Sequence, residues 1–168
     1  MSWEALEQVV AAKVLLDAFE TSDRLRRLGV PHALVGGLAV GHHGHPRATK
    51  DVDFIVGDEA FAKTSPLFVF RDELADLVQW GTIDLLATTD DPPLMEALCL
   101  PEEGEVPIVP MPALVLMKLR ASRPQDLADV SQLVAAGMDV GEVLAFLREM
   151  APEHVAPFSA IAQRALGG

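Results

Sequence analysis

The sequence contains a single cysteine, Cys99, among its 168 residues. One thiol cannot form an internal disulfide, and it excludes a zinc site built from several cysteines. Basic residues are scarce as well, since 13 lysines and arginines accompany 25 acids and the formal net charge is −12. Binding to long nucleic acids needs a clustered cationic surface. Extensive nucleic-acid binding is therefore not expected, and a reducing compartment is the natural location.

Long apolar runs are also lacking. The longest extends from Met111 to Met117 and contains Pro112, whereas a membrane-spanning helix needs about 20 apolar residues. Glu4 and Glu7 lie where a signal peptide would carry lysine or arginine. We therefore expect no membrane span, no targeting segment and a cytoplasmic location.

The residues that are present are typical of a folded α/β chain of about one domain. Apolar periodicity predicts one amphipathic helix over the first 28 residues, ending at Gly29–Pro31. Alternation predicts short buried strands, and the turn residues around them set their limits. The strand candidates are 33–35, 51–56 and 83–86, with weaker ones at 67–70 and 77–80.

A proline-rich stretch separates this α/β part from a helical part. Six of the twelve prolines fall within 92–112, where we expect a connection with a short helix at 94–98 and a strand near Ile108. The pattern after Pro112 is helical to the end of the sequence. We predict an α/β core at 1–110 and a C-terminal helical segment at 111–168 that packs on it as one compact unit.

Two aspartates share one face of the predicted strand at 51–56. Asp51 and Asp53 are two residues apart, so their side chains project to the same side about 6–7 Å apart. Paired carboxylates repel each other unless a counter-charge lies nearby, and hard oxygen ligands favour Mg²⁺ or Mn²⁺. Asp84, inside an apolar run, is a third candidate ligand for a two-metal site. The alternative is that Asp51 and Asp53 lie on a solvated strand face and that Asp84 caps a turn.

A glycine pair precedes these acids. Gly36 and Gly37 follow a predicted strand and begin a helical turn, so backbone N–H groups are expected to face a bound phosphate. Residues without Cβ atoms also let the backbone approach that anion closely. The pair could simply form a tight turn, but the thirteen-residue spacer that joins it to the Asp51–Asp53 pair makes a phosphate site the more specific interpretation.

The combination of Gly36-Gly37, Asp51-Val52-Asp53 and Asp84 resembles the signature of the nucleotidyltransferase superfamily typified by DNA polymerase beta. The wording Arg47-x-Thr49-x-Asp51-x-Asp53 is similar to that of small bacterial members, among them the toxins of type IV toxin–antitoxin pairs and the minimal antibiotic nucleotidyltransferases. A downstream Lys118, Arg123 and Asp126-x-x-Asp129 also match the toxin-like branch. The resemblance covers about residues 30 to 133. It implies an α+β fold with a small mixed sheet flanked by helices.

The resemblance also implies a role for each matching residue. Asp51, Asp53 and Asp84 would be catalytic metal ligands, and Asp84 would position or activate an acceptor hydroxyl. The nucleotide-binding residues would be Gly36, Gly37, Arg47, Thr49 and Lys118. Asp126, Asp129 and Arg123 are weaker candidates for the same site.

Several of these residues have simpler explanations. Lys118 could extend along its apolar helix to the surface, and Asp126 and Asp129 could be acids placed near a helix N-terminus after Pro124. A histidine-rich loop that contains His42-x-x-His45 could line the nucleotide pocket, lie in solvent or coordinate zinc.

The leading hypothesis is an Mg²⁺-dependent nucleotidyltransferase that transfers a nucleoside monophosphate (NMP) from a nucleoside triphosphate (NTP) to an acceptor hydroxyl. The acceptor could be a small molecule, a protein side chain or an RNA end, and a cognate partner protein is possible in a toxin–antitoxin setting. The alternative is a catalytically inactive nucleotidyltransferase-like module that binds within a protein complex. The retained Asp51, Asp53 and Asp84 favour the enzyme.

Overall fold

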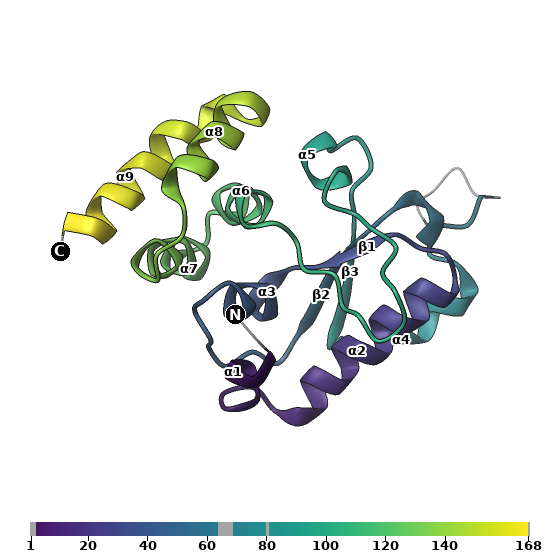
Figure 1. Ribbon diagram of the computed structural model, residues 1–168. Helices are drawn as coiled ribbons and strands as arrows, with labels where there is room; N and C mark the ends of the chain where they lie inside the picture. Colours follow the sequence, from purple (N-terminus) through teal and green to yellow (C-terminus); the bar gives the residue numbers. More distant parts are fainter. Residues whose placement is uncertain (1–2, 64–68, 80, 168) are drawn as a thin grey trace.

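The computed structural model describes residues 3–63, 69–79 and 81–167 (Figure 1). Its helices and strands follow one another in the order α1 Trp3–Glu7, α2 Ala12–Arg27, β1 His32–Leu34, α3 Gly36–His42, β2 Val52–Val56, α4 Ala75–Gln79, β3 Ile83–Ala87, α5 Pro92–Met95, α6 Met111–Ala121, α7 Pro124–Ala135, α8 Val140–Met150 and α9 Val155–Gly167. Short 3-10 turns lie at Asp58–Ala60, Asp72–Leu74 and Pro152–His154. The predicted combination of an α/β part with a helical C-terminal part is confirmed.

The three strands form a small mixed sheet in the order β1-β2-β3. β2 is central, antiparallel to β1 and parallel to β3. Its register places Phe54 opposite both Leu34 of β1 and Leu85 of β3. The mixed sheet agrees with the expected fold class.

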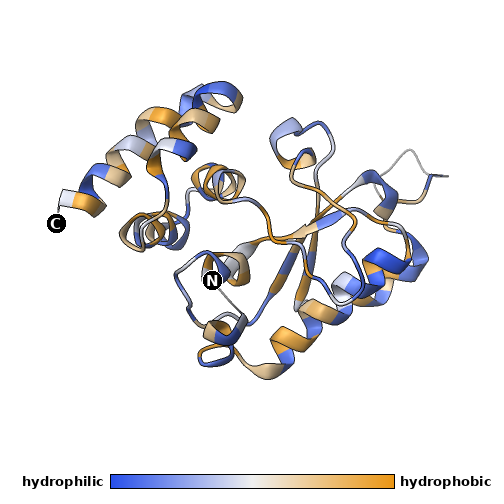
Figure 2. Cartoon of the chain, viewed as in Figure 1, coloured by the Kyte–Doolittle hydropathy of each residue, from blue (hydrophilic) through white to orange (hydrophobic). Residues whose placement is uncertain are grey.

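Both faces of β2 are covered. Val52, Phe54 and Val56 pack into a core that includes Leu15, Ala18 and Leu25 of α2, and Ile55 on the other face packs into a second core with residues of α3 and α6. Figure 1 shows α2 and α3 on opposite sides of the sheet, and Figure 2 shows apolar residues along the central strands. Because Asp53 shares the face of Ile55, its carboxylate points toward the α3 and α6 layer.

The last four helices bury a core of their own. Residues of α6, α7, α8 and α9 meet in a cluster that includes Leu116, Val130, Leu147 and Phe158. Helix α6 also contributes Ala113 and Leu114 to the core beneath the sheet. Helix α6 therefore belongs to both cores, the one of the C-terminal helices and the one against the sheet, and its polar residues lie close to the strands.

The N-terminal region differs from the expected single helix. α1 ends at Glu7 and α2 begins at Ala12, because Leu6 is fully buried against α3. A Cβ on Gly41 would lie only 2.4 Å from Leu6 Cδ2, so the missing side chain makes room for this contact. The N–H groups of Val9 and Val10 both donate to the Leu6 carbonyl, and the chain turns there.

The weaker predictions had mixed outcomes. The strand expected at 77–80 is wrong, because residues up to Gln79 continue the turn at Asp72–Leu74 as α4, whose Asp76 favours a helix N-terminus. The helix expected at 94–98 is instead the four-residue α5, which starts at the helix-favouring Pro92. Ile108 forms a single parallel bridge to Leu34. The candidate at 67–70 falls partly outside the described residues, and its Phe70 forms a bridge to Phe61.

Within the part of the chain that the structure describes, no helix has the length and apolar character needed to cross a membrane.

His32 predicts part of the pH dependence of stability. The ring is fully buried in β1, with Nδ1 2.8 Å from the Val30 carbonyl and Nε2 2.8 Å from Ser22 Oγ. Burial lowers the pKa of His32 below 6.5, and the Val30 carbonyl opposes this only in part. As the pH falls below 6.5 the unfolded chain therefore takes up a proton that the folded chain resists, and stability declines.

The free energy of unfolding, measured with urea, should fall between pH 7.5 and pH 5.5, and the fall should be smaller in His32→Gln. Burial also lowers the pKa of His42, so the variant retains part of the slope. Equal slopes in the two proteins would contradict the assignment.

Candidate functional site

The candidate site lies where α3 begins beside β2. Gly36, the first residue of α3, has φ +65°, and a Cβ there would lie 1.8 Å from Asp53 Oδ2. A Cβ on Gly37 would lie 2.9 Å from Thr49 Oγ1 and 3.4 Å from Arg47 Nη1. Gly36 thus packs against Asp53 and Gly37 packs against the 47–49 segment, and neither position has room for a side chain.

Asp53 and Asp84 are direct partners in the parallel β2–β3 register. Paired residues on neighbouring strands project to the same face, so both carboxylates lie on the side of the sheet that carries the glycine turn. Asp51 precedes β2 and is exposed. Asp53 and Asp84 are therefore neighbours on one face of the sheet, while the described residues do not bring all three predicted acids into one group that could hold a metal ion.

Asp53 is a carboxylate whose surroundings disfavour its charged form. Burial raises the pKa of Asp53 above 3.8, and the carboxylates of Asp84 and Asp51 raise it further. The cationic groups of Lys118 and Arg123 act in the opposite direction without cancelling the effect. A cation placed beside Asp53 would stabilise its charged form.

The donor set fits Mg²⁺ held jointly with a substrate. Among the described residues, no group of three or more histidine, cysteine, aspartate or glutamate side chains could hold a metal ion by itself. Mg²⁺ is usually bound by one or two carboxylates together with water and substrate phosphates. Asp53 and Asp84 supply two carboxylates beside a turn that can accept a phosphate, which matches that pattern.

A cavity of about 170 Å³ opens at this position. Four of its lining residues are charged, namely Asp53, Lys118, Arg123 and Asp126. The remaining lining residues are Val35, Gly36, Leu86, Leu114, Met117 and Ala121. Residues from β1–α3, β2, β3, α6 and α7 thus meet around one hollow.

Lys118 does not extend to the surface. Its side chain is 8% exposed, and Nζ donates to Asp126 Oδ1 at 2.9 Å and to Asp129 Oδ2 at 2.8 Å. Arg123 donates from Nε to the other oxygen of Asp126 at 2.6 Å. Burial alone raises the pKa of Asp126, but hydrogen bonds from Arg123 and Lys118 outweigh it and hold that pKa below 3.8.

Arg47 joins this group from the opposite side of the site. Its Nε and Nη2 donate to the two oxygens of Asp129 at 2.8 Å and 3.0 Å, and Gln125 Nε2 donates to Asp129 Oδ1 at 3.0 Å. Burial raises the pKa of Asp129, yet the hydrogen bonds from Arg47, Lys118 and Gln125 bring it below 3.8. Asp126 and Asp129 therefore share one helix face and hold all three cationic side chains.

Of the residues singled out in the sequence, five line the cavity: Gly36, Asp53, Lys118, Arg123 and Asp126. Gly37, Arg47, Thr49 and Asp129 lie next to them through the contacts described above, whereas Asp51 and Asp84 are exposed and do not line the cavity. The spacing of Asp126 and Asp129 indicated a shared helix face, whereas no local pattern indicated that Arg47 and Lys118 are ion-paired to them. Leu86, Met117 and Gln125 were not predicted to belong to the site. Leu86 could have been identified from its place two residues after Asp84 on the same strand face.

The histidine-rich loop has other contacts. The His42 ring packs edge-on against Trp3, with ring centroids 5.8 Å apart, and His43 Nε2 lies 2.7 Å from the Val109 carbonyl. The described residues include no metal-holding group at His42-x-x-His45.

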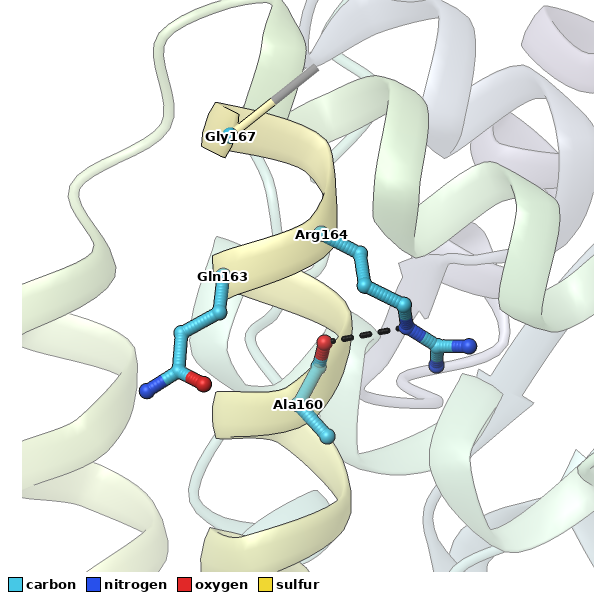
Figure 3. Close-up of a pocket in the computed structure, with 4 residues that line it drawn as sticks. All are labelled: Ala160, Gln163, Arg164 and Gly167. Atoms are coloured by element: carbon cyan, nitrogen blue, oxygen red, sulfur yellow. Dashed lines mark hydrogen bonds between the residues drawn. The ribbon is translucent and has the colours of Figure 1, made fainter.

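A separate hollow lies along α9, lined by Ala160, Gln163, Arg164 and Gly167 (Figure 3). Arg164 Nε donates to the Ala160 carbonyl of its own helix at 3.1 Å, and Gln163 points away from that bond. No acid lines this hollow, so it lacks the groups for metal binding or acid–base chemistry.

The fold is similar to a crystal structure described as an antigenic nucleotidyltransferase-like protein from Paracoccidioides brasiliensis. The two share 14% sequence identity with a TM-score of 0.51, over 90% of this chain and 94% of that one. No protein-family model matches the chain, and a search of curated proteins finds no match. The likeness confirms the expected nucleotidyltransferase-like fold.

Gly36→Ala tests the close approach to Asp53. Gly29 is a matched control, because its φ is +69° but nothing lies within 4 Å of a Cβ placed there. Gly29→Ala should lower the free energy of unfolding by about 1–2 kcal/mol through backbone strain alone. Gly36→Ala should lower it clearly more, since the Asp53 carboxylate must also move. Equal losses in urea denaturation would show that Asp53 does not occupy this place.

Lys118→Met tests the buried ion network. Removing one partner of a buried ion pair typically costs about 3–5 kcal/mol, because the remaining charges are left uncompensated. Arg120→Met on the same helix removes the partly exposed pair with Asp91 and should cost less than about 1 kcal/mol. Thermal or urea unfolding of both variants gives the comparison, and similar small losses would contradict a buried network.

Proposed function

We propose that the protein is a metal-dependent nucleotidyltransferase, which moves an NMP from an NTP to an acceptor hydroxyl and releases pyrophosphate. The observation that carries this proposal is the contact between Gly36 and Asp53, with Asp84 in direct register across the β2–β3 pair. It joins a phosphate-accepting turn and two hard oxygen ligands in one place.

The glycine turn would bind the triphosphate. The missing side chains of Gly36 and Gly37 leave room for Asp53 and Thr49, and the backbone N–H groups that begin the turn would donate to phosphate oxygens. Arg47 and Thr49 adjoin Gly37, while Lys118 and Arg123 line the cavity, so cationic side chains lie on both sides of the turn. These charges make the site suitable for a compact anion despite the net charge of −12.

Asp53 and Asp84 would hold Mg²⁺ or Mn²⁺ together with the phosphates, with Asp51 nearby as an additional acid. When bound, the metal supplies charge stabilisation at the phosphoryl oxygens. Asp84, which is exposed at the edge of the site, would accept the proton of the acceptor hydroxyl. The hydroxyl oxygen then bonds to the α-phosphorus, and the bond to the bridging oxygen breaks with its electron pair leaving on pyrophosphate.

The cavity encloses only part of an NTP. Its volume of about 170 Å³ is below the 300–1,000 Å³ typical of small-molecule sites. The rest of the nucleotide and the acceptor would therefore lie at the open side, beside Leu86 and Asp84. A small molecule, a protein side chain and an RNA end all remain candidate acceptors. The narrower likeness to toxin and antibiotic nucleotidyltransferases, a cognate partner protein and a cytoplasmic location remain predictions.

Calorimetry with ATP, GTP, CTP and UTP, each with and without MgCl₂, tests the proposal. We expect Mg²⁺-dependent binding of at least one NTP. Asp53→Asn should abolish NTP turnover and weaken the Mg²⁺-dependent binding by more than the ~10-fold that loss of an outer-sphere partner causes. Asp58→Asn is the control, because Asp58 follows the same strand but hydrogen-bonds Thr89 away from the cavity.

Asp58→Asn should bind and turn over NTP like the unaltered protein. Full turnover in Asp53→Asn would overturn the assignment of the metal site. Absence of binding with all four NTPs would overturn the proposed function itself, and tight binding to a protein partner would then favour a non-catalytic module.

A further inference from the structure

Asp129 is a fully buried carboxylate that does not line the cavity. It lies on the second turn of α7 and accepts hydrogen bonds from three residues on three different segments: Arg47 before β2, Lys118 on α6 and Gln125 on α7. A buried carboxylate is costly unless it is fully paired. Asp129 lies next to the cavity without lining it, and it holds two cationic side chains, Arg47 and Lys118, in defined positions.

The contact with Arg47 fixes the plane of the guanidinium group. Both carboxylate oxygens are engaged, by Nε at 2.8 Å and by Nη2 at 3.0 Å, which is the fork geometry that only arginine provides. The third nitrogen, Nη1, donates to the Ala48 carbonyl at 3.3 Å and lies on the side of the glycine turn, 3.4 Å from where a Gly37 side chain would begin. Arg47 is thereby held with one edge on Asp129 and the other beside the turn.

The contact with Lys118 fixes a second cation. Nζ lies between Asp129 Oδ2 and Asp126 Oδ1, and the lysine lines the same cavity as Asp53. Asp129 therefore connects the two cationic side chains that lie on opposite sides of the site, one from the strand layer and one from the C-terminal helices.

We propose that Asp129 is a positioning residue, which orients Arg47 and Lys118 toward a triphosphate bound at the Gly36–Gly37 turn. The inference rests on the proposed function, because it assigns the phosphate groups of the NTP to the space between these two cations. Asp129 touches no substrate and acts through its partners. Its removal should weaken NTP binding even where the fold is retained.

The test is a double-mutant cycle on the dissociation constant of the NTP that the unaltered protein binds most tightly in MgCl₂. Asp129→Asn and Arg47→Ala should each weaken binding by about 10- to 100-fold, as small displacements of positioning groups do. Because Asp129 acts through Arg47, adding Asp129→Asn to Arg47→Ala should weaken NTP binding by a much smaller factor than Asp129→Asn does in the unaltered protein. The small loss that remains reflects the positioning of Lys118. If Asp129 had only a structural role, the fold-losses in NTP affinity of the two single variants would multiply in the double variant.

Inorganic triphosphate in MgCl₂ is a second probe. If the loss concerns the phosphates, Asp129→Asn should weaken triphosphate and NTP by similar factors. The Arg47 Nε–H signal in ¹H–¹⁵N spectra should also move in Asp129→Asn, and it is identified by its absence in Arg47→Lys. Asp91→Asn is the matched control, since it removes an arginine–aspartate pair with Arg120 outside the cavity. It should bind both probes like the unaltered protein.

Arg47→Lys keeps the inference testable if Asp129→Asn does not fold. Lysine preserves the charge but cannot engage both oxygens of Asp129, so binding should again weaken by about 10-fold or more. Folded Asp129→Asn or Arg47→Lys protein with unchanged affinity would overturn the positioning role and leave the proposed function intact. If the unaltered protein binds no NTP, the proposed function itself fails.

Discussion

The contact between Gly36 and Asp53 determines what this structure can do. Because Gly36 has no side chain, α3 can begin directly against the Asp53 carboxylate, where a Cβ would lie only 1.8 Å away. The same contact places Asp53 beside the glycine turn, and the parallel register then adds Asp84. A residue of any other type at position 36 would displace the Asp53 carboxylate from the backbone turn, and in the proposed function the phosphate and metal sites would then be separated.

Charge pairing organises the region around this contact. Burial, and then the carboxylates of Asp84 and Asp51, raise the pKa of Asp53, whereas hydrogen bonds from cationic side chains lower the pKa values of Asp126 and Asp129. The molecule thus contains two kinds of buried or half-buried carboxylate here: Asp53, which accepts no hydrogen bond from the cations nearby in the described contacts, and Asp126 and Asp129, which hold the site's arginines and lysine in place. In the proposed function, the paired Arg47 and Lys118 would face the phosphates from fixed positions, and a bound cation would offset the charge of Asp53.

Much of the fold could be predicted from the sequence, because its strands carry local signals. The alternation in 51–56 correctly placed Val52, Phe54 and Val56 in the core and the aspartates on the other face. The break between α1 and α2 was not predictable from periodicity, since it depends on Leu6 packing against Gly41. Likewise, Arg47 and Asp129 are 82 residues apart, so no local pattern indicates their ion pair. The acids of the site were identifiable from spacing, whereas their partners depended on tertiary contacts.

The most direct test of the account is a crystal structure with Mg²⁺ and a non-hydrolysable analogue of the NTP that binds most tightly. The account predicts the triphosphate against the Gly36–Gly37 backbone, the metal between it and the carboxylates of Asp53 and Asp84, and Arg47 and Lys118 directed at the phosphates. A nucleotide bound elsewhere, or a triphosphate that does not contact the glycine turn, would contradict it.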